Sequence, residues 1–183
     1  QALLVGRRTI EAFDQTPVSN DVLYRAVQSA IAAPNRSCSE PWRFIQVGPE
    51  TVRAFAGLKR KLSQSMETAD GSSSVLDWTK VPGWCVVTTK INPNDVEVEL
   101  EDLKSVCCGI QNFMLSMWSE GVGTKWTSGP VQKTQEFANL CQVDTTFERV
   151  VGCIWYGYAA GGAKYADPRR RKKTVANVLS QLP

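Results

Sequence analysis

The sequence predicts a fold that mixes helices and strands, of either the α+β or the α/β class, and three observations lead to this expectation. Segments with apolar residues at helical spacing alternate along the chain with short apolar runs of strand-forming residues. The 183 residues are 43% hydrophobic and 21% charged, which are ordinary values for a globular domain with its own core. No internal repeat and no sign of a second domain is visible, so we expect residues 1–183 to form one domain.

The first half of the chain predicts two helices and one strand. One of residues 19–21 can cap a helix that continues to Ile31 and is ended by Pro34. The apolar run at 42–47 is typical of a strand, and Gly48-Pro49 closes it. Residues 50–66 are expected to form the second helix, and the glycine and serines of residues 67–74 indicate a loop.

The second half predicts two strands around the longest helix. Residues 84–89 have the composition of a strand buried on both faces, and residues 148–158 form the last strong strand pattern. Between them, residues 97–120 predict a long apolar helix that Gly121 ends. We expect residues 124–129 to be a connecting segment, Pro130 to open another helix, and residues 174–182 to form a terminal amphipathic helix.

A polar turn at residues 33–44 separates the first helix from the first strand. Pro34 and Pro41 fix their own φ and bias the residues before them away from helical geometry. A turn constrained in this way presents polar groups to its surroundings. It is therefore either a ligand-binding segment or a simple connection.

Composition excludes several function classes. The chain has no histidine, which removes the commonest acid–base group and the commonest metal ligand, so we expect no metal site. Its six cysteines have no metal-binding or CxxC spacing, which favours reduced thiols and a cytoplasmic location. Because the sequence begins with Gln1, an organellar location stays open if a targeting segment is missing.

Charge and hydropathy give little reason to expect a macromolecular partner. The net charge of +3 is mild, and no apolar run approaches the length of a membrane span, so we predict neither nucleic-acid nor membrane binding. The basic run at residues 169–173 is either a solvated face or, in a competing interpretation, a nucleic-acid patch.

Five motifs together resemble the FMN-dependent nitroreductase family, in its compact YdjA-like branch. Arg7-Arg8-Thr9 is similar to the family's opening motif, and residues 33–44 resemble its A-P-S-x-x-N-x-Q-P-W-x-F turn. Residues 121–126, GVGTKW, are similar to the G-L-G-T-x-W segment that follows the long helix. Residues 150–158 resemble the V-V-G-x-I-x-x-G-Y strand, and Pro168 with Arg171 resembles the closing P-x-x-R-K motif.

The resemblance implies an α+β fold with a central antiparallel or mixed sheet flanked by helices, in an intertwined homodimer. It further implies FMN bound at the dimer interface, with the turn contributed by the partner subunit. Arginine forks bind phosphate bidentately, so Arg7, with the Thr9 hydroxyl, and Arg171 are the expected phosphate clamp. The complete set of cofactor-binding residues expected from the resemblance is Arg7, Arg8, Thr9, Pro34, Asn35, Arg36, Trp126, Thr127, Ser128 and Arg171.

The implied function is an NAD(P)H oxidoreductase in which FMN carries the chemistry. Hydride passes from NAD(P)H to flavin N5 and then, in a ping-pong scheme, to a nitroaromatic, quinone or similar small electrophilic acceptor, and no protein residue is expected to be catalytic. The alternative is a low-turnover protein of the same fold that stores or senses FMN.

The chain departs from the family pattern at several positions near the expected flavin. In the turn, Asn35, Cys38 and Glu40 replace the usual Ser, Asn and Gln. Glu11 stands where several family members have a lysine that faces the flavin. Carboxylates facing the ring would disfavour an anionic reduced flavin, so we expect a lower reduction potential. Cys38 is either a redox thiol or, in the favoured interpretation, a bystander.

Overall fold

The protein is described by a computed structural model that covers residues 1–65, 77–161 and 172–182. The loop expected at residues 67–74 lies outside the described residues. Arg171, expected in the phosphate clamp, also lies outside them.

A four-stranded antiparallel sheet forms the centre of the molecule, with the order β1-β2-β4-β3. The strands are β1 (Trp42–Gln46), β2 (Gly83–Lys90), β3 (Gly123–Thr127) and β4 (Glu148–Gly157). All residues of β2 except Lys90 are buried, which confirms the expectation of a strand covered on both faces. The antiparallel pairing decides between the two predicted fold classes in favour of α+β.

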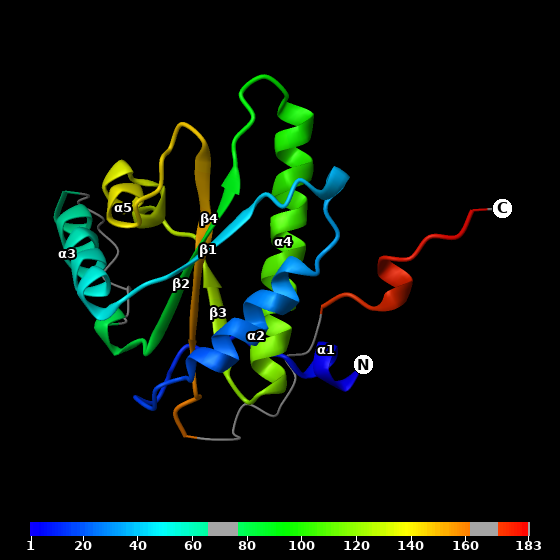
Figure 1. Ribbon diagram of the computed structural model, residues 1–183. Coiled ribbons are helices and arrows are strands. Elements are labelled where there is room, and N and C mark those ends of the chain that lie inside the picture. Colours follow the sequence, from blue (N-terminus) through cyan, green and yellow to red (C-terminus); the bar gives the residue numbers. More distant parts are fainter. Residues whose placement is uncertain (66–76, 162–171, 183) are drawn as a thin grey trace.

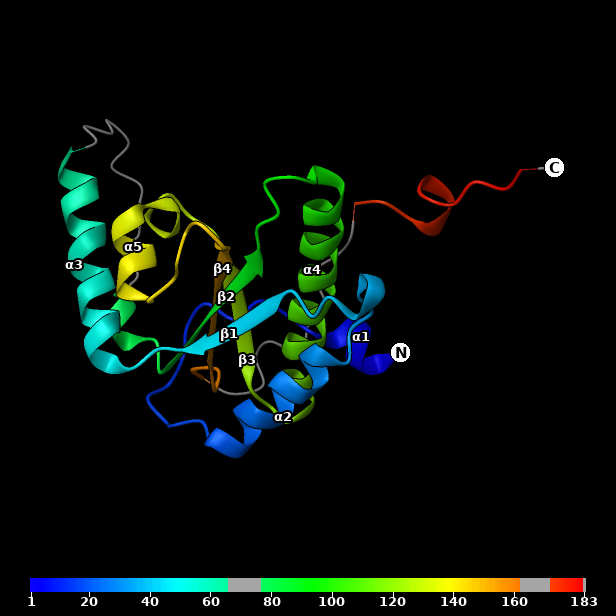
Figure 2. The ribbon, with the colours of Figure 1, turned by 45° about the horizontal axis from the view of Figure 1, so that its top comes forward.

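Helices cover both faces of this sheet (Figures 1 and 2). On one face lie α2 (Asn20–Ile31) and α4 (Val96–Ser119), which pack with the sheet around Ile110, Phe113 and Met117. On the other face lie α3 (Pro49–Ser65) and α5 (Gln135–Leu140), packed around an aromatic cluster that includes Phe55 and Trp84. Two apolar cores, one on each face, therefore hold the sheet.

The long helix α4 begins and ends as its sequence indicates. The Asp95 side chain accepts hydrogen bonds from the backbone amides of Glu97 and Val98, each at 3.1 Å. At the other end, Gly121 adopts a φ of 77°, a conformation that glycine provides without steric cost. These two signals confirm the predicted helix to within a few residues.

Two predictions about local structure within the sheet layer and its connections are wrong or incomplete. Pro130 begins only a short 3₁₀ turn (Val131–Lys133), because Thr134 caps α5 and restarts the helix at Gln135. The segment at 124–129 is largely strand β3, since its backbone pairs with β4.

The two ends of the described chain also differ from expectation. An unpredicted short helix α1 (Ala2–Gly6) precedes the paired arginines. The terminal helix expected at 174–182 is a single turn (Val175–Asn177), and every residue from 172 to 182 is exposed. In Figures 1 and 2 this segment leads away from the body of the molecule on the side of α4, so it buries no amphipathic face there.

Candidate functional site

The N-terminal segment joins the sheet beside β3. Thr9 forms a parallel bridge with Thr124, and the Ile10 amide donates to the Thr124 carbonyl at 3.0 Å. A Cβ on Gly123 would lie 2.4 Å from Ile10 Cγ1, so only a glycine permits this close approach. This pairing places Thr9 on the strand that leads to Trp126, about 7 Å further along, while Arg7 lies in the opposite direction, toward Val122.

We call the six residues Arg7, Arg8, Thr9, Trp126, Thr127 and Ser128 the β3 cluster, because the Thr9–Thr124 bridge places the first three along the same strand as the others. Arg7 Nη1 donates to the Arg8 carbonyl at 3.0 Å. Arg8 Nη1 is buried and has no hydrogen-bond partner within the described part of the chain. Because a buried guanidinium donor without an acceptor is costly, this atom indicates a group prepared to bind an anionic or carbonyl ligand.

The outer side of the β3 cluster is exposed. The side chain of Trp126 is 40% exposed although it sits in a sheet strand, and Ser128 is also exposed. The chain turns directly afterwards, where the Gly129 amide donates to Gln132 Oε1 at 2.7 Å. Since Gln132 is buried, this bond fixes the position of residues 127–129 at the edge of the sheet.

An ion pair that sequence reasoning missed lies beside the β3 cluster. Lys125 Nζ is 2.9 Å from Glu11 Oε1, and the same ammonium lies 5.4 Å from the centre of the Trp155 ring. Glu11 was singled out from the sequence as an unusual carboxylate, but its counter-ion comes from a strand 114 positions away. The local charge is therefore closer to neutral than the sequence suggested.

The polar turn contains an unusual backbone. Ser37, Cys38 and Glu40 all have positive φ values, of 51°, 53° and 42°, which non-glycine residues rarely adopt. Asn35 supports the turn, because its Oδ1 accepts from the Glu40 amide at 3.0 Å. Strain of this kind persists where the surroundings over-determine it, and it is common in ligand-binding segments.

The turn is attached to α4 and to the end of β2. Ser39 Oγ donates to the buried carboxylate of Asp102 at 2.6 Å, and Lys90 Nζ donates to the Ser39 carbonyl at 2.5 Å. Pro34 and Arg36 are exposed, so these anchors hold the turn while its other side chains face outward.

The turn and the segment leading to Arg7 lie at opposite ends of α4. The turn contacts α4 at Asp102, whereas Trp118 Nε1 lies 3.8 Å from where a Cβ on Gly6 would be. Sixteen helical residues correspond to about 24 Å. Pro34, Asn35 and Arg36 are therefore not brought to Arg7 of the same chain.

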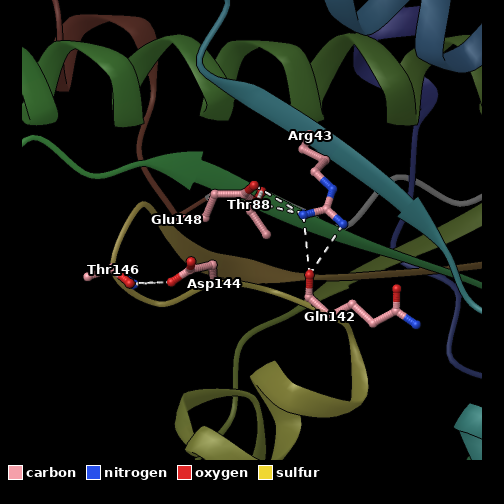
Figure 3. A network of polar contacts seen from close by, with 6 residues as sticks. All are labelled: Arg43, Thr88, Gln142, Asp144, Thr146 and Glu148. Carbon is pink, nitrogen blue, oxygen red and sulfur yellow. Dashed lines mark hydrogen bonds and ion pairs between the residues drawn. The ribbon is translucent and has the colours of Figure 1, made fainter.

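A separate polar network joins three strands at the far end of the sheet (Figure 3). Glu148 accepts from the buried Thr88 hydroxyl at 2.7 Å and pairs with Arg43 at 3.1 Å. In the adjoining loop, the Thr146 side chain and amide both donate to Asp144, and these bonds hold the pKa of that carboxyl below its usual value. Its charged groups are paired, so this network is structural.

The cysteines offer no activated nucleophile in the sheet. Burial raises the pKa of the Cys85 and Cys141 thiols to about 12 and also raises the pKa of Cys153. These thiols stay protonated at neutral pH. All six cysteines are free, as the sequence predicted: Cys38, Cys85, Cys107, Cys108, Cys141 and Cys153.

The described residues contain neither a metal-binding group nor a membrane-spanning helix. Residues 1–65, 77–161 and 172–182 contain no group of three or more potential metal ligands placed to hold an ion. Within the same ranges, no helix has both the length and the apolar character that a bilayer crossing requires.

Comparison with known proteins shows the family to which the chain belongs. The sequence matches the model of the nitroreductase family over residues 4–158. A Bacillus subtilis (strain 168) protein named "Putative NAD(P)H nitroreductase YfhC" is 30% identical over 161 residues, which cover 85% of this chain and 82% of that protein.

Solved structures share the fold at low sequence identity. A nitroreductase-like family protein from Bacillus cereus superimposes with a TM-score of 0.80 at 22% identity, covering 99% of this chain and 94% of the other. The FMN-dependent nitroreductase NfnB from Mycobacterium smegmatis, solved in complex with NADPH, gives 0.76 at 15% identity, with coverages of 100% and 97%. The fold is thus that of the nitroreductase-like α+β proteins. The chain belongs to the nitroreductase family, a family of oxidoreductases.

Proposed function

We propose that this protein is an FMN-dependent NAD(P)H oxidoreductase that reduces nitroaromatic, quinone or similar electrophilic small molecules. The observation that carries the proposal is the β3 cluster, which places two arginines, three hydroxyls and an exposed indole along one sheet edge. Family membership and the NAD(P)H in the name of the Bacillus subtilis relative agree with this function.

The residues of the β3 cluster fit FMN chemically. An FMN phosphate carries nearly two negative charges, and the buried, unpartnered Arg8 Nη1 is a donor that such a ligand would satisfy. Arg7 and the Thr9 hydroxyl add a second cation and a further donor next to it. We also assign Arg171 to the phosphate from the family resemblance.

The chain's own residues would bind and orient the reactants. When bound, FMN supplies the redox chemistry, since it accepts hydride from NAD(P)H and passes it to the acceptor at N5. Trp126 offers an indole face, and Thr127 with Ser128 offers backbone and hydroxyl hydrogen bonds at the flavin edge. No protein acid or base is needed, which is consistent with a chain that has no histidine.

We propose a homodimer in which a second copy supplies the polar turn to the β3 cluster. The turn contacts α4 about 24 Å along the helix from the contact of the segment before Arg7, which supports a site that Pro34, Asn35 and Arg36 complete in a partner. The exposed residues 172–182 offer a surface for the same assembly, because Val175, Leu179 and Leu182 are 61–90% exposed.

An anaerobic reduction experiment tests the proposal. The purified protein should be yellow, and addition of NADH or NADPH should bleach the oxidised-flavin absorption within seconds. Adding menadione or a nitroaromatic compound should then restore the colour. A persistent yellow colour would instead support the FMN-storing or FMN-sensing alternative, and a colourless protein that does not take up FMN would contradict both.

A further inference from the structure

Gly152 in β4 lies directly against two residues of the β3 cluster. A Cβ added to Gly152 would lie 2.6 Å from Trp126 Nε1 and 2.7 Å from the Thr127 carbonyl oxygen. Contacts this short do not occur in folded proteins, and the second one is with backbone. Any side chain at position 152 therefore displaces both Trp126 and Thr127.

The strand around Gly152 is irregular at the same point. In the pairing of β2 with β4, Val87 lies opposite Gly152 and Thr88 lies opposite Val150, so Val151 is an extra residue. Such a bulge bends a strand and re-aims its neighbours, and bulges are common beside active sites. The bulge and the missing side chain together create the space in which the Trp126 indole lies across β4.

We propose that Gly152 is a positioning residue for the flavin site, because it sets the orientation of the Trp126 indole and of the Thr127 carbonyl. This inference rests on the proposed function, since it assumes that Trp126 and Thr127 face the flavin. Gly152 itself need not touch the ligand. Its role is to leave room for two groups that do.

Two other glycines, Gly83 in the sheet and Gly57 in α3, provide matched controls. Gly83 is as crowded as Gly152, since a Cβ there would lie 2.2 Å from the Tyr156 ring, but Tyr156 belongs to the core and not to the β3 cluster. Gly57 in α3 has nothing within 4 Å of an added Cβ. The variants G152A, G83A and G57A thus separate a steric effect on the site from a general loss of stability.

The experiment first reads Trp126 directly, without FMN. The protein is labelled with 5-fluorotryptophan, which gives one fluorine resonance for each of its six tryptophans, and W126F assigns the resonance of Trp126. G152A should shift the Trp126 resonance, whereas G83A and G57A should leave it in place. An unchanged Trp126 resonance in folded G152A would overturn the inference.

The second measurement is FMN affinity, from the quenching of flavin fluorescence, alongside the melting temperature of each variant. G152A should weaken FMN binding by at least about tenfold, beyond any effect of G83A, and should alter the visible circular dichroism of bound flavin. Equal FMN dissociation constants for G152A and G83A would overturn the inference. If wild-type protein binds no FMN, the proposed function fails, while the fluorine shift still tests whether Gly152 positions Trp126.

A double variant covers the case in which G152A does not fold. Replacing Trp126 with alanine removes the clash with the indole but leaves the clash with the Thr127 carbonyl and the positive φ of position 152, so W126A/G152A should recover part of the soluble, folded protein that G152A loses. Recovery supports the steric coupling between the two positions. An equal loss of folded protein in G152A and in the double variant contradicts it.

Discussion

Two polar regions of the sheet differ in how their charges are satisfied. At the end where β4 begins, Glu148 accepts from the Thr88 hydroxyl and pairs with Arg43, so each charge has a partner within the chain. In the β3 cluster, by contrast, Arg8 Nη1 is buried without a partner among the described residues, and Trp126 is exposed. Both regions have cations near the edges of the sheet, but Arg43 is paired with an anion, whereas Arg8 Nη1 has no hydrogen-bond partner among the described residues.

This difference separates groups that stabilise the fold from groups that we expect to be paired only when a ligand is bound. Among the described residues, six buried side-chain atoms lack a hydrogen-bond partner, and Arg8 Nη1 is the one that belongs to a charged group, for which an unpaired state costs the most free energy. The network around Glu148 is therefore expected to contribute stability, and the β3 cluster is expected to contribute binding. Variants in each region test these two assignments, because stability and FMN affinity can be measured separately.

The largest expected effect is on FMN binding by R8A. Loss of hydrogen bonds to a charged group costs about 1.5–3 kcal/mol, which corresponds to a roughly 10- to 100-fold rise in the FMN dissociation constant. Because Arg8 Nη1 makes no hydrogen bond within the described chain, the free energy of unfolding without FMN should not fall. Fluorescence titration and urea denaturation measure the two quantities.

Arg53 supplies the control for R8A. Its guanidinium pairs with Glu50 within α3, which lies on the opposite side of the molecule from α1 in Figures 1 and 2, so R53A removes the same charge from an exposed ion pair. If R53A weakens FMN binding as much as R8A does, net charge and not the β3 cluster determines affinity.

The second prediction concerns the anchor of the polar turn. S39A removes the hydroxyl that donates to the buried Asp102 carboxylate, so the free energy of unfolding should fall by about 1–3 kcal/mol. FMN affinity should also fall, because the strained residues of the turn lose an anchor. Urea denaturation at several protein concentrations, with the FMN titration, checks both effects. Unchanged affinity in S39A would mean that the turn does not reach the flavin.

The third prediction concerns the network around Glu148, where a substitution should change stability and leave FMN affinity as it is. T88V keeps the shape of the side chain but removes the donor to Glu148, so the free energy of unfolding should fall by about 1–2 kcal/mol. FMN affinity of the folded protein should stay unchanged, because Glu148 begins β4 and stands five residues before Cys153, where the pairing of β4 with β3 ends. A loss of affinity in T88V without a loss of stability would reverse the roles assigned to the two regions.

The sequence predicted what depends on local patterns and missed what depends on distant pairing. The apolar run of β2 and the capped pattern of α4 carry their own signals, so both elements were found. Strand β3 was missed because it is defined by β4 and by Thr9, more than 100 positions away in the latter case. The role of Gly152 could not be predicted for the same reason, since it depends on the neighbouring strand.

Candidate site residues follow the same division. The sequence motifs named the residues of the β3 cluster, and the structure joins the two motifs through the bridge between Thr9 and Thr124. They did not identify Lys125 as the partner of Glu11, because that pair depends on two side chains that meet only in the folded sheet. The turn was singled out from its prolines, but its positive φ values occur at Ser37, Cys38 and Glu40, which no propensity favours strongly.

The smallest expected effect is on the reduction potential, and it follows from the pair of Glu11 and Lys125. Lys125 Nζ lies 2.9 Å from Glu11 Oε1, so the two charges largely cancel. The reduction potential of bound FMN should therefore be lowered less than the carboxylate alone would lower it. E11Q leaves the cation uncompensated and should raise the midpoint potential of bound FMN, whereas K125Q should lower it. Each shift should stay within about 30 mV, or about 1.4 kcal/mol for a two-electron couple. Spectroelectrochemical titration of both variants measures these shifts, and two shifts of the same sign would show that the pair does not act on the flavin through its charge.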